Sequence, residues 1–479
     1  MLRDFFKDSI IYTIPTVLSR GIALLLLPLY TRILSPTEYG VLDLFVVFGS
    51  LVNLTVALEI SQGIARYYAD GGTAQNKTLY ASTAFWFTCA CYLLFAVVSL
   101  TNVAWLAEAI TGRTGYEKAF NIMILFLTVN GLFYLVQNQF RFELRSKTYC
   151  IVSIIFSLVT TASAIIFIFV FKLGLEGILL GMLTGSLVAT TIGICNLRES
   201  FRPKFSPKHL KEMLVFSMPL VPSGIAVFVS LYIDRVMLSH FYSLNEVGIY
   251  SVAYRLACIS GIVMLGFQGA LTPLVYKHHK DIATPGHLAS IFRFFLVFAL
   301  LVFLSLVLFA KEILWALTTQ AYYPAGALVI YMVPAVLLAN MYIFSPGISI
   351  ANKTKYILYI NVSGAALNAL LNWLLIPNLG MQGAAIATLL ASLFVFLCYM
   401  ISSQIFYYVH HQWKQIIVSV LFIFLLAALG PFLVSNDNSF IWIILSKLSL
   451  IFCGATLIVL TGLVKQDEIK RILKVFQTA

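Results

Sequence analysis

Charged side chains are scarce in this sequence. Asp, Glu, Lys and Arg make up 10% of the 479 residues, whereas hydrophobic residues make up 61% and the mean hydropathy is +0.94. Soluble domains carry about a quarter charged residues, so this composition excludes that class. The apolar runs are continuous over about 20 residues, unlike the short alternating segments of a membrane β-barrel. The sequence therefore predicts an all-α integral membrane protein.

Several catalytic and binding motifs are also missing. The sequence has no GxxxxGK[ST] phosphate loop, no HExxH and no Ser-His-Asp grouping, and its seven cysteines lie in apolar runs without CxxC spacing. The net charge of +12 follows from basic residues in the loops on one side of the membrane, so it requires no nucleic-acid partner. We therefore expect no enzyme activity, no metal site and no cofactor.

Fourteen apolar runs are long enough to cross about 30 Å of hydrocarbon. The predicted spans are 9–33, 40–62, 79–102, 119–139, 149–171, 175–196, 214–238, 247–275, 291–310, 322–345, 356–377, 381–404, 414–434 and 440–463. If the N-terminus is cytoplasmic, most Lys and Arg residues fall in inner segments. The outer segments hold only Arg32, Arg113, Lys118, Lys172 and Lys311. This asymmetry predicts that both termini are cytoplasmic.

The chain contains an internal duplication. GIALLLLPLYTRIL, residues 21–34, aligns without gaps with GIAVFVSLYIDRVM, residues 224–237, so Arg32 corresponds to Arg235. Each copy is followed by a Glu-x-Gly step. Further along, LGLEG at 173–177 is echoed by LGMQG at 379–383. Two echoes in the same order indicate a repeat of about 200 residues, a pattern typical of secondary transporters.

The duplication predicts the domain organisation. Each repeat has six spans, an even number, so the two halves are parallel repeats related by an axis along the membrane normal. We expect six-helix lobes over 1–200 and 201–405. Residues 406–479 then form two further spans and an amphipathic cytoplasmic tail.

Basic residues inside spans are the first candidates for a functional site. A charge at that depth is costly and normally faces a wet cavity or a partner. Arg20 is expected near the midplane, and the repeat-related Arg32 and Arg235 are expected to face each other across the central axis. With Arg255 they predict a cationic cavity suited to a phosphate, which arginine can bind through two hydrogen bonds. Alternatively, Arg32 and Arg235 snorkel to the interface and Asp43 neutralises Arg32. Lys447 lies outside the repeat, and for it we favour a structural role.

Carboxylates and prolines in the spans suggest how transport is driven. A transported cation needs oxygen ligands or a titratable group; the candidates for ion coupling are Asp43, Glu59 and Asp234. Proline interrupts the helical hydrogen-bond ladder, so the first span of each half is either a bending element or statically kinked. The prolines concerned are Pro15, Pro28, Pro219 and Pro222.

A basic cluster occupies the inner loop between the halves. It consists of Arg198, Arg202, Lys204, Lys208 and Lys211. We interpret this cluster as a linker that follows the positive-inside rule, in preference to a specific lipid site.

Together these features resemble a known family. LPLYTRILSPTEYG, the LGLEG and LGMQG steps and the duplicated fourteen-span layout are similar to polysaccharide transporters of the multidrug/oligosaccharidyl-lipid/polysaccharide (MOP) superfamily, most closely the Wzx-type O-antigen flippases. The resemblance covers nearly the whole chain, although many such flippases have twelve spans. It implies a MATE-like fold and a place in lipopolysaccharide assembly. It also implies alternating-access transport of an undecaprenyl-pyrophosphate-linked oligosaccharide to the outer leaflet of the bacterial inner membrane, with membrane lipids and other polysaccharide assembly proteins as partners.

Three alternatives remain open. A peptidoglycan lipid-precursor flippase shares the fourteen-span layout. A multidrug or cation exporter of the same fold predicts a cavity dominated by carboxylates, whereas the charges inside these spans are mainly basic. A polysaccharide polymerase or ligase, an enzyme of a different class, would need a large outer loop, which the sequence lacks.

Overall fold

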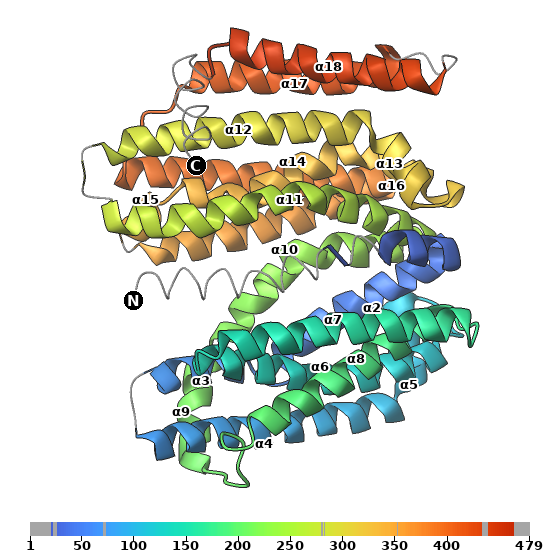
Figure 1. Ribbon diagram of the computed structural model, residues 1–479, viewed down its shortest axis with the longest axis vertical. Helices are drawn as coiled ribbons and strands as arrows, with labels where there is room; N and C mark the ends of the chain where they lie inside the picture. The colour runs from blue at the N-terminus through green and yellow to red at the C-terminus, as the bar shows by residue number, and fades with distance from the viewer. Residues whose placement is uncertain are drawn as a thin grey trace. The chain divides into compact units, whose positions relative to one another are not determined.

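The computed structural model describes residues 21–22, 26–69, 73–278, 281, 283–351, 353–433 and 439–463. All regular structure among these residues is helical, which confirms the predicted all-α fold (Figure 1). The chain divides into two compact units, Met1–Gly248 and Ile249–Ala479. The predicted span 214–238 therefore groups with the first unit by its contacts, whereas the sequence analysis assigned it to the lobe 201–405.

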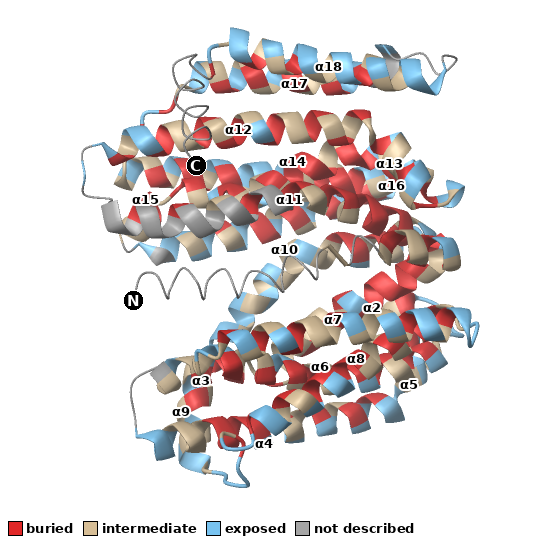
Figure 2. Cartoon of the chain, viewed as in Figure 1, coloured by how far each residue is buried: buried red, intermediate tan, exposed pale blue. Residues whose placement is uncertain are grey.

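Unit 1 is a helical bundle. Its helices are α2 (Pro36–Thr55), α3 (Ile60–Ala69), α4 (Ala74–Thr101), α5 (Val103–Thr111), α6 (Glu117–Phe142), α7 (Ser146–Phe169), α8 (Leu175–Asn196), α9 (Pro207–Ser217) and α10 (Leu220–Phe241). Helix α8 packs between α6 and α7, and α2 packs against both α6 and α10. Helices α6 and α8 are buried along much of their length (Figure 2), so they form the centre of this unit.

Unit 2 contains most of α11 (Leu244–His278), which begins in unit 1. It also contains α12 (Thr284–Leu308), α13 (Ala310–Leu317), η1 (Gln320–Leu328), α14 (Val329–Asn340), η2 (Met341–Phe344), α15 (Gly347–Ile350), α16 (Thr354–Phe406), α17 (Trp413–Leu433) and α18 (Phe440–Leu460). Helix α14 packs against α12 and α16. The last two helices, α17 and α18, pack against each other and against α12.

Eleven helical segments among the described residues are long and apolar enough to cross a membrane. One of them contains two of the predicted spans, 356–377 and 381–404. They meet inside α16 at Gly380, whose φ of 56° and ψ of −135° are not helical. Glycine adopts a positive φ without strain, so the LGMQG step is where the chain turns from one span into the next.

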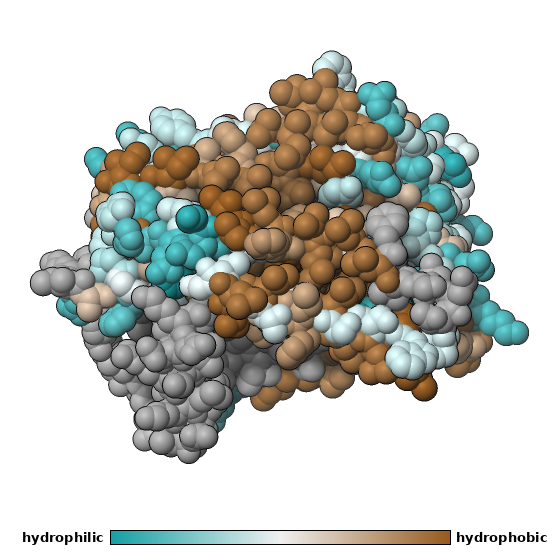
Figure 3. All heavy atoms as spheres, turned by 90° about the horizontal axis from the view of Figure 1, so that it is seen from above, coloured by the Kyte–Doolittle hydropathy of each residue, from teal (hydrophilic) through white to brown (hydrophobic). Residues whose placement is uncertain are grey.

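The face of unit 2 that carries α17 and α18 has a broad apolar area, as a lipid-facing surface should have (Figure 3). Trp442, Phe452 and Leu460 on α18 are each more than half exposed. Figure 3, which looks onto the side of unit 2 that carries α17 and α18, shows a broad hydrophobic area between hydrophilic groups. An exposed apolar area of this size is stable only where lipid or protein covers it.

The two Glu-x-Gly steps of the repeat occupy equivalent helix starts. Ser35 caps α2: its Oγ accepts from the Glu38 backbone N–H, and the Glu38 carboxylate accepts from the Ser35 N–H at 2.9 Å. At the start of α11, the Ser243 Oγ accepts from the Glu246 N–H at 3.4 Å. Ser-x-x-Glu is the sequence signature of a helix N-terminus. Both repeats therefore begin their second span with the same capping residues.

These two helix starts also touch. A Cβ atom on Gly40 would lie 2.0 Å from the backbone oxygen of Leu244, and one on Gly248 would lie 1.9 Å from that of Pro36. The contact is reciprocal, because Pro36 and Leu244 are themselves equivalent positions in the repeat. Only glycine allows the backbones to approach so closely, which explains why both copies end in glycine.

The first predicted span of the second half needs a correction. We expected one span over 214–238 with prolines inside it, but α9 ends at Ser217 and α10 begins at Leu220. Pro219 immediately precedes α10 and Pro222 is its third residue. A missing N–H is tolerated in the first turn of a helix. These prolines therefore mark the boundary between a linker helix and a span, and they do not kink the middle of the span.

Candidate functional site

The predicted span 40–62 is interrupted in the structure. Helix α2 ends at Thr55 and α3 begins at Ile60, and between them Leu58 and Glu59 have φ angles of 50° and 52°. Residues other than glycine seldom adopt this left-handed conformation, and each such residue costs about 1–3 kcal/mol. Broken helices within membrane proteins occur where the backbone lines a cavity.

Two backbone hydrogen bonds, each between residues three apart in the sequence, span the break. The Leu58 N–H donates to the Thr55 carbonyl at 3.2 Å, and the Ile60 N–H donates to the Ala57 carbonyl at 3.0 Å. No glycine or proline occurs between Thr55 and Ile60, so the usual sequence signals for a helix break are absent. The only hint in the sequence is Glu59 itself, a carboxylate within an apolar run.

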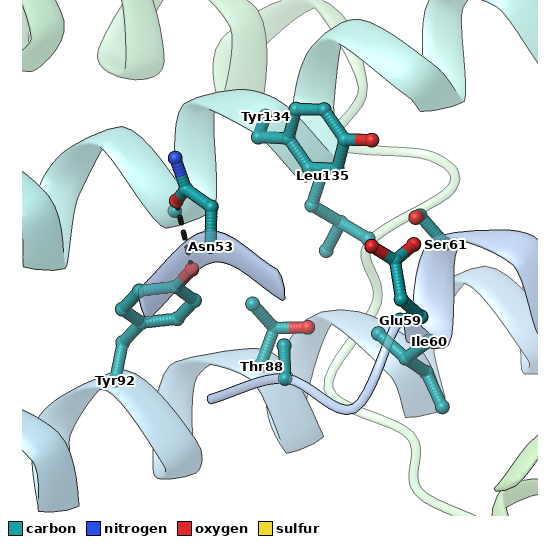
Figure 4. Close-up of a pocket in the computed structure, with 10 residues that line it drawn as sticks. Asn53, Glu59, Ile60, Ser61, Thr88, Tyr92, Tyr134 and Leu135 are labelled. Carbon is teal, nitrogen blue, oxygen red and sulfur yellow. Dashed lines mark hydrogen bonds between the residues drawn. The ribbon is translucent and has the colours of Figure 1, made fainter. Parts of the chain in front are cut away.

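The break opens onto a small pocket between the α2–α3 segment, α4 and α6 (Figure 4). Its polar lining comes from Asn53, Glu59, Ser61, Thr88, Tyr92 and Tyr134. The space between the atoms totals about 270 Å³, but most of it is too narrow to admit a water molecule, and the open part is small. That is room for about one water molecule. The pocket can hold a water or a bare cation, but not a sugar.

The polar groups of the pocket are only partly satisfied. The Tyr92 hydroxyl donates to the Asn53 Oδ1 at 3.0 Å (Figure 4). Thr88 is 1% exposed and its Oγ1 has no hydrogen-bond partner. Figure 4 shows the half-buried Glu59 carboxylate beside the Ser61 hydroxyl. Carboxylate, amide and hydroxyl oxygens are the ligands of small hard cations, and a half-buried carboxylate can also carry a proton.

Gly131 closes the pocket on the α6 side. A Cβ atom at this position would lie 1.9 Å from the Cζ of Tyr92, so only glycine lets α6 approach the tyrosine ring. The ring is 2% exposed and its hydroxyl is directed to Asn53. Gly131 therefore fixes the Tyr92 side chain at the edge of the pocket.

A separate cluster of buried charges joins α2 to α10. The Arg235 Nε lies 2.9 Å from Asp43 Oδ2, and its Nη1 lies 3.2 Å from Asp234 Oδ1. The same Nη1 donates to the Leu231 carbonyl at 3.0 Å. The three charged residues are between 3% and 8% exposed. Buried charges persist when they are paired in this way, so the cluster acts as a tertiary clamp.

This cluster changes two of our expectations. Arg235 was expected to line a cationic cavity, but its guanidinium is buried between two carboxylates. Asp43 was considered as a partner for Arg32, but it pairs with Arg235, and Arg32 is exposed. Spacing along the sequence could not reveal this pairing, because it depends on how α2 packs against α10.

The remaining predicted site residues lie elsewhere. Arg255 is half-buried in α11, within unit 2, and Pro28 lies in the helical segment 26–33. Arg20 and Pro15 lie outside the described residues. The structure thus brings Asp43, Asp234 and Arg235 together and places Glu59 in a pocket of its own.

Within the described part of the chain, no three His, Cys, Asp or Glu side chains cluster as a metal site would require.

Lys447 has the structural role that the sequence favoured. Its Nζ lies 2.5 Å from the Glu312 Oε1 and 5.6 Å from the centre of the Phe309 ring. Glu312 belongs to α13 and Lys447 to α18. The ion pair therefore attaches the last helix to the rest of unit 2.

Comparisons with known proteins agree with this architecture. Residues 5–279 match the family described as "Polysaccharide biosynthesis protein". The chain is 26% identical over 309 residues to "Lsg locus putative protein 1" of Haemophilus influenzae, covering 61% of this chain and 72% of that protein.

Solved structures show a similar fold at low sequence identity. The lipid II flippase MurJ in an inward closed conformation aligns with a TM-score of 0.75 at 15% identity, covering 93% of this chain and 98% of that one. An inward-facing multidrug resistance MATE transporter of the MOP superfamily aligns with a TM-score of 0.65 at 14% identity, over 83% and 97% of the two chains. These likenesses establish the fold. The chain is thus a multi-pass membrane protein with the MOP fold and belongs to the polysaccharide biosynthesis protein family.

Proposed function

We propose that this protein is a flippase for an undecaprenyl-pyrophosphate-linked oligosaccharide, such as an O-antigen repeat unit. It moves the substrate from the cytoplasmic to the periplasmic leaflet of the bacterial inner membrane by alternating access, with both termini in the cytoplasm. The observation that carries the proposal is the family match over residues 5–279 combined with a fold like that of a lipid II flippase. A flippase of this kind forms and breaks no covalent bonds, so we propose no enzyme activity.

Positive charge along the pathway is the second part of the proposal. A pyrophosphate cannot cross an apolar region unpaired, so the pathway must supply cations at depth. Arg20, Arg32 and Arg255 remain candidates for this role. Arg235 does not, because two carboxylates already neutralise it.

Glu59 is the carboxylate best suited to ion coupling. Asp43 and Asp234 are occupied by Arg235, whereas Glu59 lines a pocket with room for a single water or cation. Its pocket also contains the unpaired Thr88 hydroxyl. We propose that Glu59 binds the proton or cation whose gradient drives the transport cycle.

Glu59→Gln tests the coupling role. The variant should translocate a fluorescent lipid-linked oligosaccharide in vesicles at a rate that no longer depends on an imposed proton or sodium gradient. Glu108→Gln is the matched control, because Glu108 is an exposed carboxylate on α5 and its loss should leave the gradient dependence intact. A Glu59→Gln protein that responds to the gradients as strongly as the parent would rule Glu59 out.

Complementation tests the flippase function itself. A strain without its O-antigen flippase should regain surface polysaccharide when it expresses this chain. The Arg20→Ala variant should not restore it, and Arg20→Lys should restore only part, because an ammonium keeps the charge but lacks the planar fork of a guanidinium. Full restoration by Arg20→Ala at normal protein levels would exclude Arg20 from the pathway. Efflux of small organic cations without any translocation of lipid-linked sugar would favour the exporter alternative.

A further inference from the structure

The loop between α8 and α9 is held in one conformation by α4. The Ser82 hydroxyl donates to the Ser200 carbonyl at 2.8 Å and accepts from the Arg202 N–H at 3.0 Å. The Trp86 indole N–H donates to the Arg202 carbonyl at 3.0 Å. The backbone that carries the basic cluster is therefore fixed to the bundle by side-chain hydrogen bonds.

Helix α9 is fixed in the same way. The Tyr80 hydroxyl donates to the Glu212 carboxylate at 2.6 Å, and the His209 ring packs edge-on against the Tyr80 ring at 4.4 Å. Met213 is fully buried and approaches α3 at Gly63. One face of α9 is thus docked on α3 and α4, and the opposite face remains exposed.

The exposed side carries unneutralised positive charge. The five basic residues of the cluster predicted from the sequence are all exposed: Arg198, Arg202, Lys204, Lys208 and Lys211. None of them forms an ion pair with a carboxylate in the described part of the chain. The nearby Glu212 carboxylate is engaged by Tyr80. A fixed surface with this charge attracts anions.

An apolar groove adjoins these charges where α9 gives way to α10. It is lined by Pro207, Leu210, Lys211, Leu214, Val215, Met218 and Pro219, and it is shallow and open on its outer side. Val215 and Met218 are 67% and 51% exposed, so their apolar surface is uncovered within unit 1. Lys211 belongs to both the basic cluster and the groove.

We propose that this surface binds an anionic phospholipid of the surrounding bilayer. The phosphate of its headgroup pairs with Lys208 and Lys211, and an acyl chain fills the groove beside Val215 and Met218. Anionic headgroups attract basic residues at a membrane surface, and the chain covers apolar area that would otherwise meet water. From the sequence alone we interpreted the cluster as an ordinary linker. The groove beside it is the added observation that favours a defined lipid site.

The proposal is independent of the substrate that the protein transports. A bound phospholipid would hold α9, the helix that leads into α10, at the membrane surface. An alternative occupant with similar chemistry is the polyprenyl-phosphate carrier of the substrate. Its binding is an outcome of the experiment below.

Native mass spectrometry of the purified full-length protein tests the site, with palmitoyl-oleoyl phosphatidylglycerol and phosphatidylcholine as equimolar competing probes. The parent should retain phosphatidylglycerol preferentially. Lys208→Gln combined with Lys211→Gln should weaken its binding about 25-fold, since each basic residue near an anionic headgroup contributes about fivefold. Val215→Gln combined with Met218→Gln should weaken the binding of both lipids, because it makes the groove polar.

The matched control removes two exposed lysines elsewhere, Lys353→Gln with Lys355→Gln, and should leave lipid binding unchanged. A salt titration of the parent protein tests the electrostatic contribution without any substitution. Its binding of phosphatidylglycerol should weaken as the salt concentration rises. Three results would overturn the proposal: equal binding of the two lipids by the parent, equal loss in the control, or displacement of phosphatidylglycerol by stoichiometric undecaprenyl phosphate.

Discussion

The role of Arg235 can be decided by a single substitution. Arg235→Met removes the charge but keeps most of the side-chain volume, and it leaves Asp43 and Asp234 buried without their partner. At 2.9 Å and 3.2 Å, the two ion pairs each provide about 5–6 kcal/mol of gross attraction at an effective dielectric constant of about 20, which offsets the desolvation of the charges. Breaking a buried pair by removing one partner typically costs about 3–5 kcal/mol. We expect a loss of stability of that size.

Unfolding in mixed detergent micelles measures the effect, and the duplication supplies the control. Arg32→Met changes the equivalent residue of the other repeat, which is exposed, and should alter stability by less than about 0.5 kcal/mol. Adding Asp43→Asn to Arg235→Met should recover part of the loss, because it removes one of the two uncompensated charges. An Arg235→Met protein as stable as the parent but unable to translocate substrate would refute the structural role and restore Arg235 to the pathway.

Two further predictions concern the pocket wall and the loop between α16 and α17. Gly131→Ala should destabilise unit 1 by about 1–3 kcal/mol, because the new methyl group overlaps the Tyr92 ring. The control Gly286→Ala should not destabilise the protein, because the space around Gly286 is open. Thermal unfolding of both variants in detergent measures the difference. Burial, with smaller contributions from Arg293 and His410, lowers the pKa of His411 to about 4. Between pH 6.5 and pH 4 the unfolded chain therefore binds more protons than the folded one. The stability of the protein should fall as the pH falls through this range. His411→Asn should flatten that pH dependence of the melting temperature, and an unchanged slope in the variant would contradict the assignment.

The sequence by itself determined the membrane-embedded, all-helical character of the protein and its internal duplication. Apolar runs of spanning length have no other stable conformation in a bilayer, because every backbone polar group must be satisfied within the segment. The repeated Glu-x-Gly steps also had structural consequences that follow from local chemistry. Each begins a helix capped by a serine, and each ends in a glycine at a close backbone contact.

Only the tertiary structure decided what the polar residues inside the spans do. Arg32 and Arg235 align in the repeat, yet one is exposed and the other is buried against Asp43, because pairing depends on which helix faces are brought together. The break before Glu59 is likewise invisible in a sequence without glycine or proline at that point. A helix of apolar residues is locally stable at almost every position. Where it breaks, and which charges it buries, depend on packing against helices distant in the sequence, and local residue patterns do not encode those contacts.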